Sequence, residues 1–227
     1  MDVQQLLLAR DLVLIAFDGP VAELPATDSA DSLRTMVADT RMPRKVARTR
    51  DPLVVLDYAA TVGPATAVAV HRQLRRIERG AVVTARPAPG VVEAMKAMVA
   101  TGTKIALVSA MVIDAVRSFV VMHGLDEYVW RVAGRGGADC SVLPPAPDLL
   151  LEVTRGRAAE DCGFVGATGV DLAAGRAARI STYRYRRPAE HAGEPDVEPD
   201  VEPPGPSRLR PMAPPSLPWF EALCAAS

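Results

Sequence analysis

The chain has 227 residues, of which 49% are hydrophobic and 23% charged, a composition typical of a soluble globular protein with one substantial core and a small accessory domain. The formal net charge of −1 and the 4% content of aromatic residues disfavour nucleic acid and membrane surfaces as partners. The three cysteines are widely spaced and form no CxxC pattern, so the sequence predicts neither a zinc site nor a disulfide framework.

The N-terminal region indicates a cytoplasmic protein. Residues 1–10 predict a short helix, and they lack the basic start of a secretory signal. No apolar run in the chain is long enough to span a membrane. We therefore expect reduced thiols and a cytoplasmic location.

The first predicted strand is the most informative segment. Residues 12–17 (LVLIAF) form an apolar run that ends abruptly at Asp18-Gly19-Pro20. This pattern predicts a buried parallel strand whose carboxyl end presents one acid and then turns. Because ligands of open α/β sheets bind at the carboxyl ends of the strands, Asp18 is a candidate site residue.

Residues 22–85 depart from a simple alternation of strands and helices, and we interpret them as a helical insertion. Its expected elements are a polar loop (25–31), a basic stretch with five Lys/Arg in ten residues (41–50) and two helices (52–61 and 64–79). Four arginines of the second helix, Arg72, Arg75, Arg76 and Arg79, fall outside its apolar positions. They are typical of a solvent-exposed face rather than of a substrate clamp.

The alternation of strands and helices resumes after Pro87 and predicts an α/β fold with a doubly wound, mostly parallel, Rossmann-like sheet. The expected strands are 104–109, 128–132, 162–166 and, as the last one, 179–183. The expected helices are 89–100, 112–123, 148–154 and 171–178. Residues 1–21 and 86–186 would therefore form the core domain, and 22–85 a small cap.

The composition changes after residue 186. Residues 187–214 are rich in proline, and the window 188–206 holds six acids and no Lys or Arg. Such a segment buries too little apolar surface to offset its ordering entropy, so we expect it to be disordered. Residues 215–227 contain Trp219, Phe220 and Leu223, which favour docking of this C-terminal segment on the core.

Four strand ends carry a resemblance to a known family. They are 16–20 (AFDGP), 107–109 (LVS), 143–148 (LPPAPD) and 165–171 (VGATGVD). In this order and spacing they resemble the four motifs of the haloacid dehalogenase (HAD) superfamily, above all its phosphatases of the phosphoglycolate phosphatase and β-phosphoglucomutase type. Residues 22–85 lie where that group carries a helical cap, and the resemblance covers about residues 5–185.

The resemblance implies a chemistry and a set of residues. In the family pattern an Asp attacks phosphorus, a second Asp two residues later is the acid and base, a Ser or Thr binds phosphate, a Lys neutralises charge and carboxylates hold Mg²⁺. Asp18 matches the acid/base position and Ser109 the phosphate-binding position, with Ala110 and Gly19 beside the phosphate. Asp18 and Asp171 match metal-binding positions.

Three charged positions of the family pattern are missing from this chain. The nucleophile position is Ala16, the lysine position is Pro144, and Ala167 replaces a metal ligand of the fourth motif. Removing a covalent nucleophile costs on the order of 10⁶ in turnover in a well-studied protease. The sequence therefore indicates a HAD-fold pseudoenzyme, with no cofactor expected and with Mg²⁺ relevant only to residual phosphatase activity.

The sequence leaves alternatives open for the surviving residues. Asp18 is either a residual base or a strand-end acid that accepts backbone N–H groups, Ser109 binds an anion or caps the next helix, and Asp171 orients a metal or caps its own helix. Lys45 and Lys104 are the candidates to replace the lost lysine, although Lys104 lies at the wrong end of its strand.

Two functions remain at this point. The first is a non-catalytic binding or regulatory protein whose partner is an unknown protein or an anionic small molecule, without nucleic acid or membrane. The second is a weak or altered Mg²⁺-dependent phosphatase that acts on a small phosphate ester through Asp18.

Overall fold

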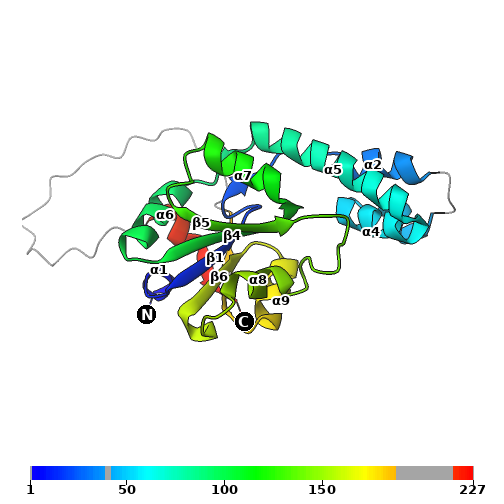
Figure 1. Ribbon diagram of the computed structural model, residues 1–227. Helices are drawn as coiled ribbons and strands as arrows, with labels where there is room; N and C mark the ends of the chain where they lie inside the picture. The colour runs from blue at the N-terminus through cyan, green and yellow to red at the C-terminus, as the bar shows by residue number, and fades with distance from the viewer. Residues whose placement is uncertain (1, 39–41, 188–216, 227) are drawn as a thin grey trace, which may run out of the picture.

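A six-stranded sheet forms the centre of the protein in the computed structural model, which describes residues 2–38, 42–187 and 217–226 (Figure 1). The strands lie in the order β5-β4-β1-β6-β7-β8, and all neighbouring pairs are parallel except β7 and β8. Their bounds are β1 Leu12–Ala16, β4 Lys104–Val112, β5 Val129–Arg135, β6 Cys162–Gly166, β7 Ser181–Tyr185 and β8 Leu223–Ala225. The predicted α/β fold with a mostly parallel sheet is confirmed.

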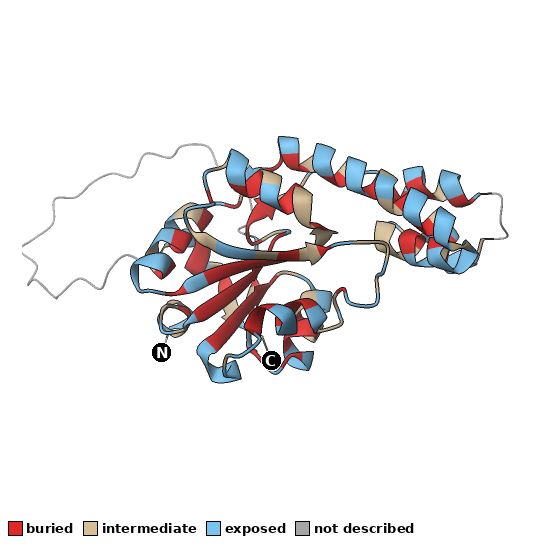
Figure 2. Cartoon of the chain, viewed as in Figure 1, coloured by how far each residue is buried: buried red, intermediate tan, exposed pale blue. Residues whose placement is uncertain are grey.

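The sheet separates two apolar cores. On β1, Val13 and Ile15 face one core and Leu12 and Leu14 the other, because successive side chains of a strand point to opposite faces. Helices α1 Val3–Leu8, α6 Val91–Ala100 and α7 Ile113–Met122 cover the first face, and α8 Asp148–Thr154 and α9 Gly169–Ala177 cover the second. Figure 2 shows the buried residues running along the central strands between these helices.

Helices from the described part of residues 29–84 form a lobe beside the sheet. Its helices are α2 Ser29–Arg34, α3 Arg44–Arg48, α4 Pro52–Val62 and α5 Pro64–Thr84. They enclose an apolar cluster that includes Leu33, Leu56 and Leu74. A short antiparallel ribbon, β2 Ala22–Glu23 with β3 Arg86–Pro87, connects the lobe to the sheet, and α5 packs along α7 (Figure 1).

Several predicted bounds are wrong: α5 runs on to Thr84, β5 runs on to Arg135, and β7 is Ser181–Tyr185 rather than 179–183. Three further differences have a tertiary cause. Helix α2 begins at Ser29, inside the segment predicted as a polar loop, because Leu33 and its neighbours are buried in the lobe. Strand β4 continues to Val112 because this residue pairs with Arg135 of β5. Strand β7 is not the last strand, since Leu223–Ala225 pairs with it as β8.

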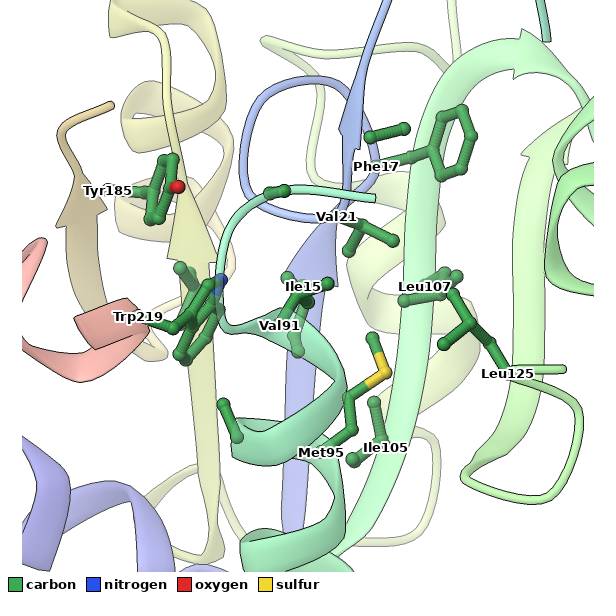
Figure 3. Packing of buried hydrophobic residues seen from close by; sticks show 14 of the residues in the cluster. Ile15, Phe17, Val21, Val91, Met95, Ile105, Leu107, Leu125, Tyr185 and Trp219 are labelled. Carbon is green, nitrogen blue, oxygen red and sulfur yellow. The ribbon is translucent and has the colours of Figure 1, made fainter. Parts of the chain in front are cut away.

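The C-terminal segment packs on the first core. Trp219, in α10 Pro218–Glu221, is fully buried, and its indole Nε1 donates a hydrogen bond to the carbonyl of Pro20 at 2.8 Å. Figure 3 shows the Trp219 ring between Tyr185 and the side chains of Val91 and Ile15. A Cβ atom on Gly90 would lie 3.2 Å from the backbone nitrogen of Trp219, so α6 and α10 approach closely at this glycine.

Two further sequence-based predictions concern the disorder of residues 187–214 and the absence of a membrane span. The expected disorder of 187–214 falls almost wholly outside the described residues, which resume at 217. Among the described helices, none combines the length and the apolar character that crossing a bilayer requires.

Candidate functional site

The carboxyl end of β1 is the centre of the candidate site. In the parallel pairing of β1 with β4 and β6, Ala16 lies beside Val108 and Ile15 beside Val165. The residues that follow these strands therefore reach one edge of the sheet, and Asp18, Ser109 and Asp171 come from its three central strand ends.

The turn after Asp18 is built by a left-handed glycine. Gly19 has a φ of 93°, and a Cβ atom there would lie 3.1 Å from the Ala167 methyl. The Gly19 N–H donates to the Ala22 carbonyl at 2.9 Å, and the Ala22 N–H donates to the Phe17 carbonyl at 2.9 Å. The resemblance placed Gly19 beside the phosphate, but its N–H already has an acceptor, the Ala22 carbonyl, within the turn.

Asp18 has an unusual electrostatic environment for an exposed residue. Neighbouring atoms crowd its carboxyl group, and this desolvation raises its pKa above the ordinary value. The charge of Asp171 raises the pKa further, and Arg187 opposes the rise. Asp18 therefore holds a proton more readily than an ordinary surface aspartate does.

Ser109 is buried inside a bulge of β4. Val108 pairs with Ala133 and Val112 pairs with Arg135, so β4 carries two extra residues over this interval. The Ser109 hydroxyl accepts a hydrogen bond from the Met111 N–H at 3.0 Å. Helix α7 starts only at Ile113 and has no side-chain cap, so the alternative that Ser109 caps it is wrong.

Gly134 makes room for this bulge on the neighbouring strand. A Cβ atom at Gly134 would lie 2.9 Å from the Met111 carbonyl oxygen and 3.3 Å from the Ile113 Cα. Any side chain there would push β5 away from the bulge, because backbone atoms give way only at high cost. The loop beside Ser109 is therefore held by the packing of two strands.

Asp171 is the inner member of a capping box. Its Oδ2 accepts hydrogen bonds from the Thr168 N–H at 2.9 Å, the Thr168 hydroxyl at 2.8 Å and the Ala167 N–H at 3.2 Å. The Thr168 hydroxyl in turn accepts from the Asp171 N–H at 3.1 Å. Asp171 therefore helps to cap the start of its own helix, which was one of the two predicted roles. The N-cap residue of α9 is Thr168, and Asp171 is its partner in the capping box.

Ala16, Pro144 and Ala167 stand where the family pattern has charged side chains, and they lie in apolar or half-buried surroundings. Ala16 is 5% exposed and belongs to the second core together with Leu143, which precedes Pro144. Ala167 is half-buried against Gly19. These side chains end in carbon, so they offer neither a nucleophile, nor a cation, nor a metal ligand.

A pocket of about 370 Å³ opens between the sheet edge and the lobe. Asp18 is the only predicted site residue on its wall, and Ser109 and Asp171 lie outside it. The wall combines apolar residues such as Leu24, Leu74 and Ile77 with the polar residues Thr27, Ser29 and Glu78. Arg50 supplies the one cation of the lining and has no hydrogen-bond or ion-pair partner among the described residues.

Sequence reasoning missed a buried polar network between lobe and sheet. Arg135, 1% exposed, donates through Nη2 to both carboxylate oxygens of Glu78 at 2.6 and 2.5 Å, and through Nε to the Ala110 carbonyl at 3.1 Å. Glu78 also accepts from the Val112 N–H at 3.0 Å. The signal available in the sequence was Glu78 itself, an acid one turn after Leu74 on the apolar side of its helix.

His71 completes this network. Its Nδ1 lies 2.6 Å from Nη1 of Arg135, and burial together with the charges of Arg135 and Arg75 lowers its pKa. The ring is therefore neutral at pH 7, with Nδ1 as acceptor and the proton on Nε2. Burial raises the pKa of Glu78, and Arg135 and the Val112 N–H oppose that rise. The network fixes α5 onto the end of β5.

The other reactive side chains do not replace the missing groups. Burial raises the pKa of the Cys140 thiol to about 11, with Asp57 adding to the rise, so it is protonated at neutral pH. Lys104 is the first residue of β4, at the amino end of the strand and away from the candidate site, where its Nζ lies 5.5 Å from the centre of the Trp130 ring. Lys45 is exposed on α3 and does not line the pocket.

The environment of Asp18 predicts a specific pH dependence. Because the folded state raises its pKa, the contribution of Asp18 to stability is present below the unfolded value of about 4 and is lost as the pH rises through the folded value. NMR titration of the Asp18 carboxyl carbon should give a raised midpoint that falls in Asp171→Asn and rises further in Arg187→Gln. An unshifted midpoint in the unmodified chain would contradict this account.

Comparisons with known proteins identify the fold. No family model and no curated protein matches the chain. Among solved structures it matches a predicted phosphatase from Clostridium acetobutylicum with a TM-score of 0.58 and 12% identity, over 76% of this chain and 83% of that one. It also matches a haloacid dehalogenase-like hydrolase from Bacteroides fragilis (TM-score 0.56, 17% identity, 76% and 86% covered).

A predicted phosphoglycolate phosphatase from Haemophilus somnus 129PT matches as well, with a TM-score of 0.54 and 18% identity over 77% of this chain and 84% of that one. At these identities the likeness is one of fold. This chain has the fold of the HAD-superfamily hydrolases, in the form found in phosphoglycolate phosphatase-like phosphatases.

Proposed function

We propose that this chain is a non-catalytic binding protein, a pseudoenzyme that keeps the HAD fold without its phosphoryl-transfer chemistry. One observation carries the proposal. At the end of β1, where the family pattern has its nucleophile, the side chain is the buried Ala16 methyl. A methyl group cannot attack phosphorus, and neither Cys140 nor a lysine lies on the pocket wall to act for it.

The donor set also argues against Mg²⁺. This ion prefers six oxygen ligands in a near-octahedral array. Here Ala16 and Ala167 have no side-chain oxygen to offer, and Oδ2 of Asp171 already accepts three hydrogen bonds in its capping box. Within residues 2–38, 42–187 and 217–226, no three His, Cys, Asp or Glu side chains gather as a metal-binding group. The residues present do not fit the ion.

The pocket suits a small anion with an apolar body. The guanidinium of Arg50, which has no partner among the described residues, would bind a carboxylate or phosphate, and Leu24, Leu74 and Ile77 would contact apolar groups of the same ligand. Asp18 stands on the same wall and would accept a hydrogen bond from a hydroxyl or amine. We further propose a cytoplasmic location, because all three cysteines are free thiols.

One observation keeps a second function open. Asp18 lies on the pocket wall and has a raised pKa, which are properties of a general acid or base. In that alternative the chain is a weak phosphatase in which Asp18 activates water for attack on a small phosphate ester.

A turnover assay tests the proposal. With p-nitrophenyl phosphate and a panel of phospho-sugars in the presence of Mg²⁺, we expect the chain and its Asp18→Asn variant to give the same rate as buffer, since no group accepts the phosphoryl. Mg²⁺-dependent turnover that Asp18→Asn abolishes would establish the weak phosphatase instead.

A gain-of-binding experiment supplies the matched control. The double variant Ala16→Asp with Ala167→Asp restores two carboxylates beside Asp18. We expect calorimetry to detect Mg²⁺ binding to this variant and none to the unmodified chain. Equal Mg²⁺ binding by both proteins would mean that the existing carboxylates already suffice.

A further inference from the structure

The largest exposure of apolar side chains occurs where α5 and α7 lie side by side. Val83 of α5 and Val121 of α7 are each 68% exposed, and Met122 beside Val121 is 49% exposed. These three residues line one open groove between the two helices, together with Arg79 and Arg117. An exposed apolar patch with a charged border is typical of a protein interaction site.

A cluster of arginines continues this groove along α5. Arg79 also lines a second hollow, whose other walls are Arg72, Arg75 and Arg76. The four positions are spaced three and four residues apart and share one exposed face of the helix. Only Arg75 has an acidic partner among the described residues, Asp114 of α7.

The arrangement is costly for the isolated protein. Like charges three and four residues apart destabilise a helix, and exposed valines gain nothing from water. The opposite side of α5, with Leu74, Ile77 and Glu78, faces the pocket of the candidate site. Apart from Arg75, which pairs with Asp114 of α7, these arginines and Val83 contribute neither to that pocket nor to an ion pair within the described residues.

We infer that this surface binds an acidic, amphipathic peptide segment of a partner protein. The α5–α7 face is defined by Arg72, Arg75, Arg76, Arg79, Val83, Arg117, Val121 and Met122. From Arg72 to Val83 the helix rises by about 16 Å, which matches about three turns of a bound helix. Guanidinium groups pair with carboxylates in bidentate geometry, and the groove takes the apolar side chains of the same segment.

The chemistry of the face selects this partner over others. A small anion would need the arginines alone and would leave the groove empty. Single-stranded nucleic acid binds through aromatic stacking, and the face contains no aromatic side chain. This inference is independent of the proposed function, because it uses residues on the other side of α5.

Fluorescence anisotropy with the full chain tests the inference. The probe is a labelled 16-residue synthetic helix with Leu on one face and Glu elsewhere, and we expect saturable binding that weakens as salt is added. Arg72→Glu with Arg76→Glu should lower the affinity at least tenfold, and Val83→Ser with Val121→Ser should also lower it. Unchanged binding by either pair would overturn the inference.

A matched control separates a specific site from general attraction. Arg44→Glu with Arg48→Glu makes the same charge change at the same spacing on exposed residues of α3. We expect this variant to bind the probe as the unmodified chain does. An equal loss of affinity would mean that net charge, not the α5–α7 face, attracts the peptide. A probe with Ser in place of Leu that bound equally well would likewise rule out the groove.

Two other occupants of the face give distinct results. If a second copy of the chain covers it, analytical ultracentrifugation will show a dimer that Val83→Ser with Val121→Ser dissociates. If the acidic residues 190–202 of the chain itself occupy it, replacing their six acids with Gln will raise the affinity for the probe about tenfold. Either result overturns the assignment to a separate partner.

Discussion

Replacing Arg135 with alanine is expected to lower the free energy of unfolding by about 3–5 kcal/mol, because the Glu78 carboxylate would stay buried without its partner. Arg135 is 1% exposed and also holds the Ala110 carbonyl and His71. Urea unfolding at pH 7, followed by circular dichroism, measures the change.

Arg131→Ala is the matched control on the same strand. Its ion pair with Glu152 is 42% and 49% exposed, and exposed pairs contribute under about 1 kcal/mol. A double replacement, Arg135→Met with Glu78→Leu, should recover part of the loss, because it removes both buried charges together but leaves the Val112 N–H and the Ala110 carbonyl without their partners. If Arg135→Ala and Arg131→Ala cost the same, the network does not hold the lobe to the sheet.

Replacing Trp219 with alanine is the second large effect, a loss of about 3–5 kcal/mol. The fully buried indole packs against Tyr185 and Phe220, with ring centroids 6.0 and 5.3 Å away, and donates to the Pro20 carbonyl. Since Pro20 lies within the turn after Asp18, we also expect faster amide hydrogen exchange at Val21 and Ala22. Urea unfolding and hydrogen-exchange mass spectrometry test the two parts.

Two variants separate the contributions of Trp219. Trp219→Phe keeps a ring in the core but leaves the Pro20 carbonyl without its donor, so we expect a smaller loss of about 1–3 kcal/mol. Trp130→Ala removes an indole that is 47% exposed and should cost under about 1 kcal/mol. A Trp219→Ala protein as stable as Trp130→Ala would show that the C-terminal segment does not support the core.

Local signals predicted much of the fold. The bounds of β6 and α8 agree with their predictions, because an apolar run and a proline-bounded helix are encoded by neighbouring residues. The extension of β4 to Val112 and the pairing of β8 depend on strands far away in the sequence. Such pairings leave no periodic pattern, so the sequence could not indicate them.

The site was predictable only in outline. Parallel strand ends reach one edge, so the positions of Asp18 and Ser109 followed from the apolar runs before them. The hydrogen bond from Met111 to Ser109 arises from a bulge, and the contact of Glu78 with Arg135 joins residues 57 apart in sequence. The pocket wall, with Arg50, depends on how the lobe packs on the sheet.

The antiparallel strand β8 has a consequence for solubility. An open sheet edge presents unpaired N–H and C=O groups to which another chain can add as a strand. Residues Tyr183–Tyr185 of β7 pair with Leu223–Ala225, so the edge strand on this side of the described sheet is β8, which has only three residues. A strand this short offers few free groups to another chain, whereas loss of β8 would leave the longer, tyrosine-containing β7 as the edge strand.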